Sequence, residues 1–268
     1  MLRKIGSWIG LNRRLCKWFL AVITVALAVK LVAGAGDKIT YLTRYEWWHL
    51  LVLFGGVFAY FAVNAYQMLV VVRSCGASDL DFATWFKFFI LGRFGNTLVS
   101  QSGSVYRAVA LKRDHGLLYA RYVAAFGFFA WLNILFNLTL AGILILVFEP
   151  ELKIAGIPAG AGVLALALAG LIAPAVAEKL FTERAPANDL LRKIHQTADN
   201  ILGAFSDARS DPSLVAAVIA LACVLFGIGV LRLRVALVPF GSSPGLGHVA
   251  LFLAVVKLSG LVVITPGN

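Results

Sequence analysis

Residues 82–121 read FATWFKFFILGRFGNTLVSQSGSVYRAVALKRDHGLLYAR, and the rest of the chain is arranged around them. The stretch begins as an apolar helix too short to cross a bilayer, and we expect it to break at Gly92-Arg93-Phe94-Gly95-Asn96. It continues through Ser100-Gln101-Ser102-Gly103-Ser104 into a basic segment that ends near Arg113. An apolar helix, a polar break and a basic segment in this order predict a re-entrant hairpin that binds an anionic head group inside the membrane.

The composition is that of a polytopic membrane protein. The 268 residues are 60% hydrophobic and 14% charged, with a mean hydropathy of +0.87, which excludes a soluble domain. The net charge of +11 would suit nucleic-acid binding, but the Lys and Arg lie mostly in loops between apolar segments, so we expect no nucleic-acid partner. The scattered Cys16, Cys75 and Cys223 indicate neither a disulfide framework nor a metal site. We predict an all-α bundle with no cofactor.

The apolar segments fit a single membrane domain over residues 1–268. We expect spans at residues 18–32, 47–72, 122–148, 157–177 and 213–231, and a last apolar run at 249–264. The basic N-terminus followed by residues 18–32 is also typical of a secretory signal peptide, but the length of the apolar run favours a retained span. This places the N-terminus in the cytoplasm of a multi-pass protein of the cell (inner) membrane.

The distribution of positive charge decides how the stretch at 82–121 meets the membrane. If it crossed, the basic clusters at 107–121 and 179–209 would both lie outside, against the positive-inside rule. If it returns, both clusters are cytoplasmic, so we predict a hairpin entered from the cytoplasmic side. The second cluster belongs to a cytoplasmic loop, 178–212, in which Asn188 to Phe205 has amphipathic helical spacing. That helix lies on the membrane interface or packs on the protein itself; the pattern fits both.

A second copy of the hairpin motif begins near the C-terminus. Residues 93–104 align with residues 257–268 without a gap, each after an apolar helix, and each combines a basic residue with a later small-Gly-polar break. Three spans separate the copies, so they face opposite leaflets. The pattern predicts an inverted repeat of two re-entrant hairpins, the second at 248–268 and C-terminally incomplete.

Packing motifs inside the spans have simple interpretations. Asn133 and Asn137 lie four apart on one helix face, which favours hydrogen bonds to a neighbouring helix over contact with a substrate. Gly156 and Gly160 form a GxxxG pair, which predicts a helix-packing surface.

The motif residues carry a resemblance to a known family. They are Asn96, Ser102-Gly103, Tyr106-Arg107-Ala108, Leu111-Lys112-Arg113 and Gly116, with Thr265-Pro266-Gly267-Asn268 near the end. Over nearly its whole length the chain resembles the lysylphosphatidylglycerol synthase transmembrane region, a flippase-like integral membrane family. It departs from the family at Gln101-Ser102, where a Pro often precedes the Gly, and at Asn268, where members usually continue through a Gly and a Glu.

The resemblance implies a role in moving lipid between leaflets. Similar proteins include the membrane half of the multiple peptide resistance factor and proteins of hopanoid or lipid-linked glycan pathways. Nothing in the chain resembles the soluble aminoacyl-transferring domain of the resistance factor. If the protein moves lipid, a separate lipid-synthesising enzyme is therefore an expected partner.

The predicted lipid head-group site combines both hairpins. Its members are Arg93, Asn96, Ser102, Gly103, Ser104, Arg107, Lys257, Pro266, Gly267 and Asn268. Arg93 has no acidic partner in any apolar span, which favours a phosphate ligand over a structural ion pair. Ser102 to Ser104 open the returning helix, whose backbone N–H groups attract anions. Arg107 is either a second phosphate-binding residue or a charge that snorkels to the interface. Lys257 is predicted to bind phosphate in the second hairpin for the same reason as Arg93 in the first.

These residues predict a translocase that moves an anionic phospholipid or a polyprenyl- or hopanoid-type lipid, and that is not an enzyme. The alternative is a non-transporting scaffold for an enzyme of lipid-glycan or hopanoid synthesis, docking through Asn188 to Phe205. Gly241-Ser242-Ser243-Pro244-Gly245 matches the G-x-S-x-G motif of hydrolases, but it lies in a loop between apolar segments, so we predict no catalytic residue there.

Overall fold

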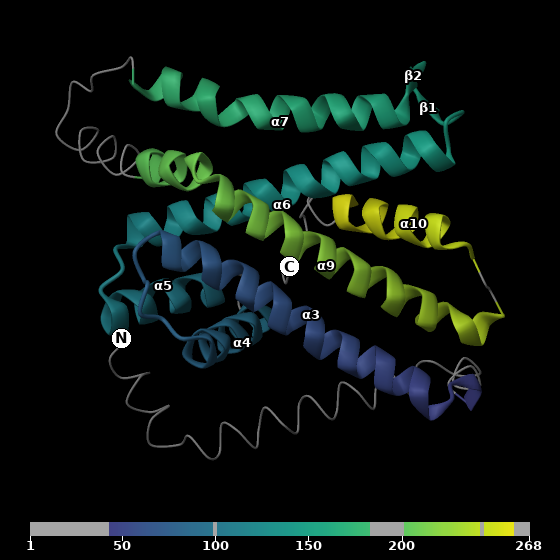
Figure 1. Ribbon diagram of the computed structural model, residues 1–268, viewed down its shortest axis with the longest axis horizontal. Coiled ribbons are helices and arrows are strands. Elements are labelled where there is room, and N and C mark those ends of the chain that lie inside the picture. The colour runs from purple at the N-terminus through teal and green to yellow at the C-terminus, as the bar shows by residue number, and fades with distance from the viewer. Residues whose placement is uncertain (1–42, 99–100, 183–200, 242–243, 260–268) are drawn as a thin grey trace.

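The computed structural model describes residues 43–98, 101–182, 201–241 and 244–259, and these residues are overwhelmingly helical. The helices are α3 (Trp47–Ser74), α4 (Phe82–Leu98), α5 (Ser102–His115), α6 (Tyr119–Phe148), α7 (Ala159–Thr182), α9 (Pro212–Leu237) and α10 (Leu246–Ser259) (Figure 1). Residues 201–210 are also helical, and a 3-10 turn, η2 (Val238–Phe240), follows α9. The strands β1 (Lys153–Ile154) and β2 (Ile157–Pro158) form a small antiparallel hairpin.

Among the residues that the structure describes, four helices are long and apolar enough to cross a membrane. They cover Trp47–Ser74, Tyr119–Phe148, Ala159–Val176 and Pro212–Phe240. The predicted spans at 47–72 and 122–148 are confirmed to within a few residues. In the predicted span at 157–177, Ile157 and Pro158 form strand β2 and the helix begins at Ala159, while the span predicted at 213–231 continues as α9 to Leu237. The predicted first span, residues 18–32, lies outside the described residues. The chain is a multi-pass membrane protein of the all-α class.

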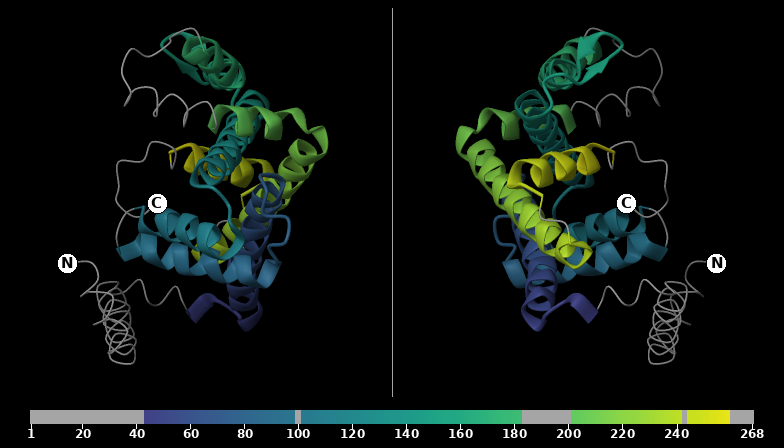
Figure 2. Two further views of the ribbon diagram at one scale, coloured as in Figure 1. Left: turned by 90° about the vertical axis from the view of Figure 1, so that its left-hand side faces the viewer. Right: turned by 90° about the vertical axis from the view of Figure 1, so that its right-hand side faces the viewer.

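The long helices pack as antiparallel neighbours. Between α3 and α9, the Gln67 side chain donates a buried hydrogen bond of 2.8 Å to the carbonyl oxygen of Val218. The hydroxyl of Tyr45, just before α3, donates a partly buried hydrogen bond of 2.9 Å to the carbonyl oxygen of Ala236. Between α6 and α7, Trp131 Nε1 donates to the carbonyl oxygen of Gly170 at 2.8 Å. Figure 2 shows the α4–α5 pair and α7 at opposite edges of the molecule, with α6, α9 and α10 between them.

Two packing predictions need correction. Gly160 does pack closely, but against Gly142 and Leu146 of α6. Gly156 has φ 82° in the turn between β1 and β2, and nothing lies within 4 Å of its Cβ position. The Asn133 and Asn137 side chains donate to backbone oxygens four residues earlier in α6 itself, at 2.8 and 2.6 Å, and not to a neighbouring helix. The short amide side chain reaches its own helix more easily than a partner some 8–10 Å away.

The main core lies at one end of the bundle. Its largest fully buried side chains include Met68 of α3, Trp85 and Phe89 of α4, Leu111 of α5 and Phe128 of α6. Trp85 Nε1 donates a buried hydrogen bond of 2.7 Å to the carbonyl oxygen of Ala65, which fixes α4 on α3. The α4–α5 pair is therefore a structural part of the bundle.

Candidate functional site

Helices α4 and α5 form a tight antiparallel hairpin. A Cβ atom on Gly103 would overlap the carbonyl oxygen of Gly92, and the side chains of Phe88 and Tyr106 meet edge to face one turn away. Asn96 Oδ1 accepts a hydrogen bond of 2.7 Å from the backbone N–H of Gly103. Small residues at the crossing let the two backbones approach, as in close helix pairs within membranes.

The position of the break differs from the sequence prediction. Gly92 to Asn96 lie inside α4, which continues to Leu98, and the chain turns between α4 and α5 through Gln101, whose φ is 65°. Gly92 and Gly95 face α5, at Gly103 and Ser102 respectively, so these glycines serve close packing and do not end the helix. Helix α5 begins at Ser102, where the sequence predicts the returning helix.

A polar contact joins the open end of the hairpin. His115 Nδ1, at the end of α5, lies 2.9 Å from Asp79 Oδ2, just before α4. The hydrogen bond from His115 lowers the pKa of Asp79 below its ordinary value, and a backbone hydrogen bond acts in the same direction. Both chain ends of the hairpin thus lie together.

Arg107 is the buried charge of the hairpin. The residue is only 5% exposed; its Nε donates to the carbonyl oxygen of Gly103 at 3.2 Å, and Nη2 lies 3.5 Å from Ser104 Oγ. Within the described part of the chain no carboxylate pairs with it, because the ion pairs there are Arg113–Asp114 and His115–Asp79. A guanidinium has five N–H donors, so donors of Arg107 remain for a ligand.

Arg93 lies beside the same aromatic ring as Arg107. The guanidinium carbons of Arg93 and Arg107 are 5.5 and 5.7 Å from the centroid of Phe89, and Arg93 is also 5.7 Å from the ring of Phe61 on α3. Arg93 itself is exposed. Cation–π contacts stabilise each guanidinium modestly, but they do not cancel the repulsion between two like charges. An anion bound beside both guanidinium groups would offset that repulsion.

The remaining predicted residues of the first hairpin fall into two groups. Ser102 and Ser104 occupy the first turn of α5, and Ser104 contacts Arg107. Asn96 and Gly103 bond to each other, so the Gly103 N–H is already satisfied and is not available to an anion. These two residues therefore position the hairpin, and their contact with a head group stays a prediction.

Sequence reasoning missed two aromatic residues of the site. Phe89 lies four residues before Arg93 on α4, a spacing that places its ring under the guanidinium, so this signal was available in the sequence. Tyr122, on the first turns of α6, has a buried hydroxyl with no hydrogen-bond partner in the part of the chain that the structure describes. No sequence pattern marks it.

The second predicted motif is only partly visible. Lys257 lies on α10, while Pro266, Gly267 and Asn268 lie outside the described residues. Helix α10 packs on α6 through Gly247 and Phe148 and on α9 through Leu253 and Gly229. Figure 1 shows α10 toward the end of the bundle opposite the α4–α5 hairpin. The inverted repeat stays a prediction.

The chain matches a known protein family over most of its length. Residues 18–268 match the family described as the lysylphosphatidylglycerol synthase TM region. The chain belongs to this family. Comparison with curated proteins and with solved structures gives no match.

Membership in the lysylphosphatidylglycerol synthase TM region family confirms the resemblance and makes this a lipid-related membrane protein. Several of the residues that carried the resemblance have a physical role in the hairpin. Asn96 and Gly103 form its internal hydrogen bond, and Arg107 is its buried cation. The recognisable residues of this family member thus coincide with the contacts that hold the candidate site.

Proposed function

We propose that this protein is a lipid translocase of the flippase-like kind, which binds an anionic head group at the α4–α5 hairpin. The observation that supports the proposal is the buried Arg107 guanidinium, which has no acidic partner within the described residues. Removing a charge from water costs several kcal/mol, so such a group is retained where it binds an anion. The activity proposed is movement of lipid and involves no covalent chemistry.

The hairpin has the right form for this task. Its helices, of 17 and 14 residues, are each shorter than the roughly 20 residues that a membrane span needs. Their outer ends meet at the Asp79–His115 contact, so the hairpin enters and leaves the membrane from the same face in our proposal. In this arrangement Arg107 and Arg93 lie inside the membrane, where their positive charges can bind the head group as it passes.

The expected substrates share a phosphate group and hydrocarbon tails. An anionic phospholipid and a polyprenyl phosphate both fit, and a hopanoid-type lipid fits if it carries an anion. Guanidinium groups bind phosphate oxygens through paired N–H donors, which an ammonium does not match. The tails remain in the bilayer while the head group passes the hairpin.

The test compares Arg107→Gln, Arg107→Lys and Arg93→Gln with Arg113→Gln as the control. The Arg113 side chain is 74% exposed and pairs with its neighbour Asp114, so its loss leaves the site intact. Native mass spectrometry reports co-purified lipid, and proteoliposomes with fluorescent phosphatidylglycerol report movement between leaflets. We expect Arg107→Gln to lose bound anionic lipid and movement, Arg107→Lys and Arg93→Gln to be reduced, and Arg113→Gln to match the wild type.

Unchanged lipid retention and movement in a folded Arg107→Gln protein would refute the proposed role. The scaffold alternative would then gain weight. In the scaffold alternative the segment from Asn188 to Phe205 would dock a partner. Its described end packs within this chain, because Phe205 lies edge to face on Phe128 and Trp131.

A further inference from the structure

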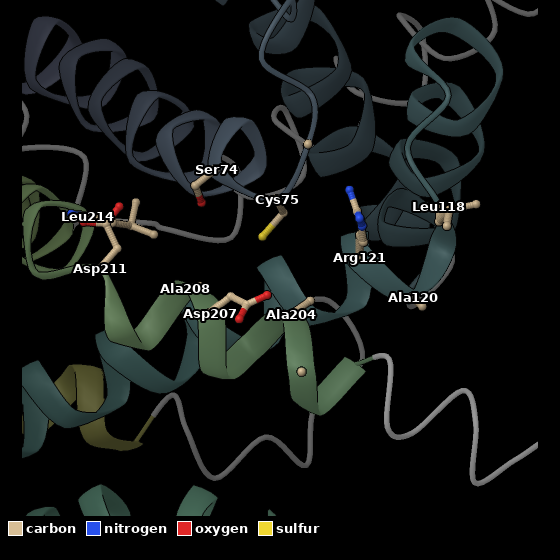
Figure 3. Close-up of a pocket in the computed structure, with 12 residues that line it drawn as sticks. Ser74, Cys75, Leu118, Ala120, Arg121, Ala204, Asp207, Ala208, Asp211 and Leu214 are labelled. Carbon is tan, nitrogen blue, oxygen red and sulfur yellow. Dashed lines mark hydrogen bonds between the residues drawn. The ribbon is translucent and has the colours of Figure 1, made fainter.

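A pocket lies at the end of the bundle where α3 ends and α6 begins. Its volume is about 550 Å³, and it opens between the C-terminal end of α3, the first turn of α6 and the helix at 201–210. Figure 3 shows the Cys75 thiol near its centre, with Arg121 to the right of the thiol and Asp207 below it. None of its lining residues belongs to α4 or α5, so it is separate from the hairpin site.

The pocket holds two opposite charges that do not pair. Arg121 comes from α6 and Asp207 from the helix at 201–210, and no salt bridge joins them to each other or to any other described residue. Asp211 also lines the pocket, but its carboxylate caps α9 by accepting from the N–H groups of Ser213 and Leu214 at 2.9 and 3.2 Å. Asp207 is therefore the carboxylate available to a ligand.

The backbone holds the positive charge at the pocket wall. Arg121 Nη1 lies against Gly76, where a Cβ atom would be 2.9 Å from it, and Gly76 has φ 117°. Only glycine accepts this φ without strain, and only glycine leaves room for the guanidinium. The guanidinium therefore lies beside the C-terminal end of α3, whose partial negative charge stabilises it. Nearby backbone N–H groups in the first turn of α6 add positive potential.

We propose that this pocket binds a phosphoethanolamine group, with the phosphate at Arg121 and the ammonium at Asp207. Asp207 would repel a purely anionic ligand, and Arg121 would repel a purely cationic ligand. A ligand that carries both charges a few bonds apart can interact favourably with Arg121 and Asp207 at the same time. The same group occurs as a lipid head group and as a free metabolite. The pocket opens at one end of the spanning bundle, where either source can reach it.

Cys75 provides a direct reporter of occupancy. The residue is only 8% exposed and lines the pocket, and burial raises the pKa of its thiol, so it reacts slowly with maleimide near neutral pH. The test uses the full chain with Cys16→Ser and Cys223→Ser, so that only Cys75 is labelled. The ligands are dihexanoyl phosphatidylethanolamine, dihexanoyl phosphatidylglycerol and O-phosphoethanolamine. Labelling rate is followed as a function of each ligand concentration.

We expect the ethanolamine lipid to protect Cys75 at about tenfold lower concentration than the glycerol lipid, since one charge-assisted hydrogen bond is at stake. Asp207→Asn should abolish that preference, and Arg121→Gln should weaken protection by both lipids. The exposed pair Arg113→Gln and Asp114→Asn serves as the matched control and should change nothing. Protection by O-phosphoethanolamine as well would assign a soluble source, and protection by the lipid alone a membrane source.

The proposal is overturned if neither ethanolamine ligand protects Cys75, or if the preference survives Asp207→Asn. It is also overturned if Arg121→Gln binds both lipids like the wild type. Arg121 and Asp207 are exposed and unpaired by salt bridges in the described residues, so their variants should fold normally. Arg107→Gln should leave Cys75 protection intact, which separates failure of this proposal from failure of the hairpin site.

Discussion

Gly103 of α5 lies directly against the carbonyl oxygen of Gly92 in α4. The contact is so close that a single methyl group on Gly103 would overlap both the Gly92 carbonyl and Asn96 Oδ1. The crossing fixes the distance between the helices that carry Arg93 and Arg107. Any change that separates the backbones here also separates the two cations.

Gly103→Ala should destabilise the hairpin strongly. The new methyl group meets backbone atoms that cannot rotate away, and overpacking of a closely packed site costs about 1–3 kcal/mol or more. Thermal unfolding followed by tryptophan fluorescence in detergent should show a clear drop in the midpoint. Gly127→Ala on α6 is the control, because nothing lies within 4 Å of its Cβ position. Equal midpoints for the two variants would contradict the close approach.

Asn96→Ala should also loosen the hairpin, but less. It removes the 2.7 Å hydrogen bond to the Gly103 N–H, and polar contacts between membrane helices are worth about 0.6 kcal/mol, at most about 1.7. Asn96→Asp keeps the acceptor oxygen and should retain more stability than Asn96→Ala. The unfolding midpoint distinguishes them. If Asn96→Ala were as stable as the wild type, this bond would have no role in holding the hairpin.

The sequence determined the spans well because length and hydropathy alone identify a membrane helix. The prediction placed the hairpin turn too early, because a sequence does not distinguish glycines that end a helix from glycines that allow two helices to pack closely. Gly92 and Gly95 are of the second kind, and their contacts with α5 at Gly103 and Ser102 depend on the tertiary structure. For the same reason the sequence favoured Arg93 over Arg107, although Arg107 is the buried one. The β1–β2 hairpin was not expected, since two-residue strands carry no readable periodicity.

Trp131→Phe should weaken the attachment of α7 to α6. Phe keeps most of the ring contacts but removes the 2.8 Å hydrogen bond from Nε1 to the Gly170 carbonyl, again worth about 0.6 kcal/mol. We expect a small drop in the midpoint of thermal unfolding. Trp48→Phe removes an Nε1 bond to Glu46 at an exposed site and should have less effect. A larger loss in Trp48→Phe would argue against this account of the α6–α7 contact.

The contact between Asp79 and His115 predicts how the open end of the hairpin responds to pH. A carboxylate only accepts, so His115 Nδ1 donates, and this bond lowers the pKa of Asp79 below its ordinary 3.8. A depressed folded-state pKa means that the contribution to stability is present above pH 3.8 and is lost as pH falls through the lower, folded value.

Carbon-13 NMR of labelled aspartate carboxyls in nanodiscs can measure this pKa directly. His115→Ala should move the pKa of Asp79 upward toward 3.8, because the largest cause of its depression is gone. Asp81 is the internal control: its pKa is lowered by hydrogen bonds from Thr84, so it should titrate the same way in both proteins. An Asp79 pKa that does not change in His115→Ala would show that the contact between the two ends of the hairpin does not form in the membrane.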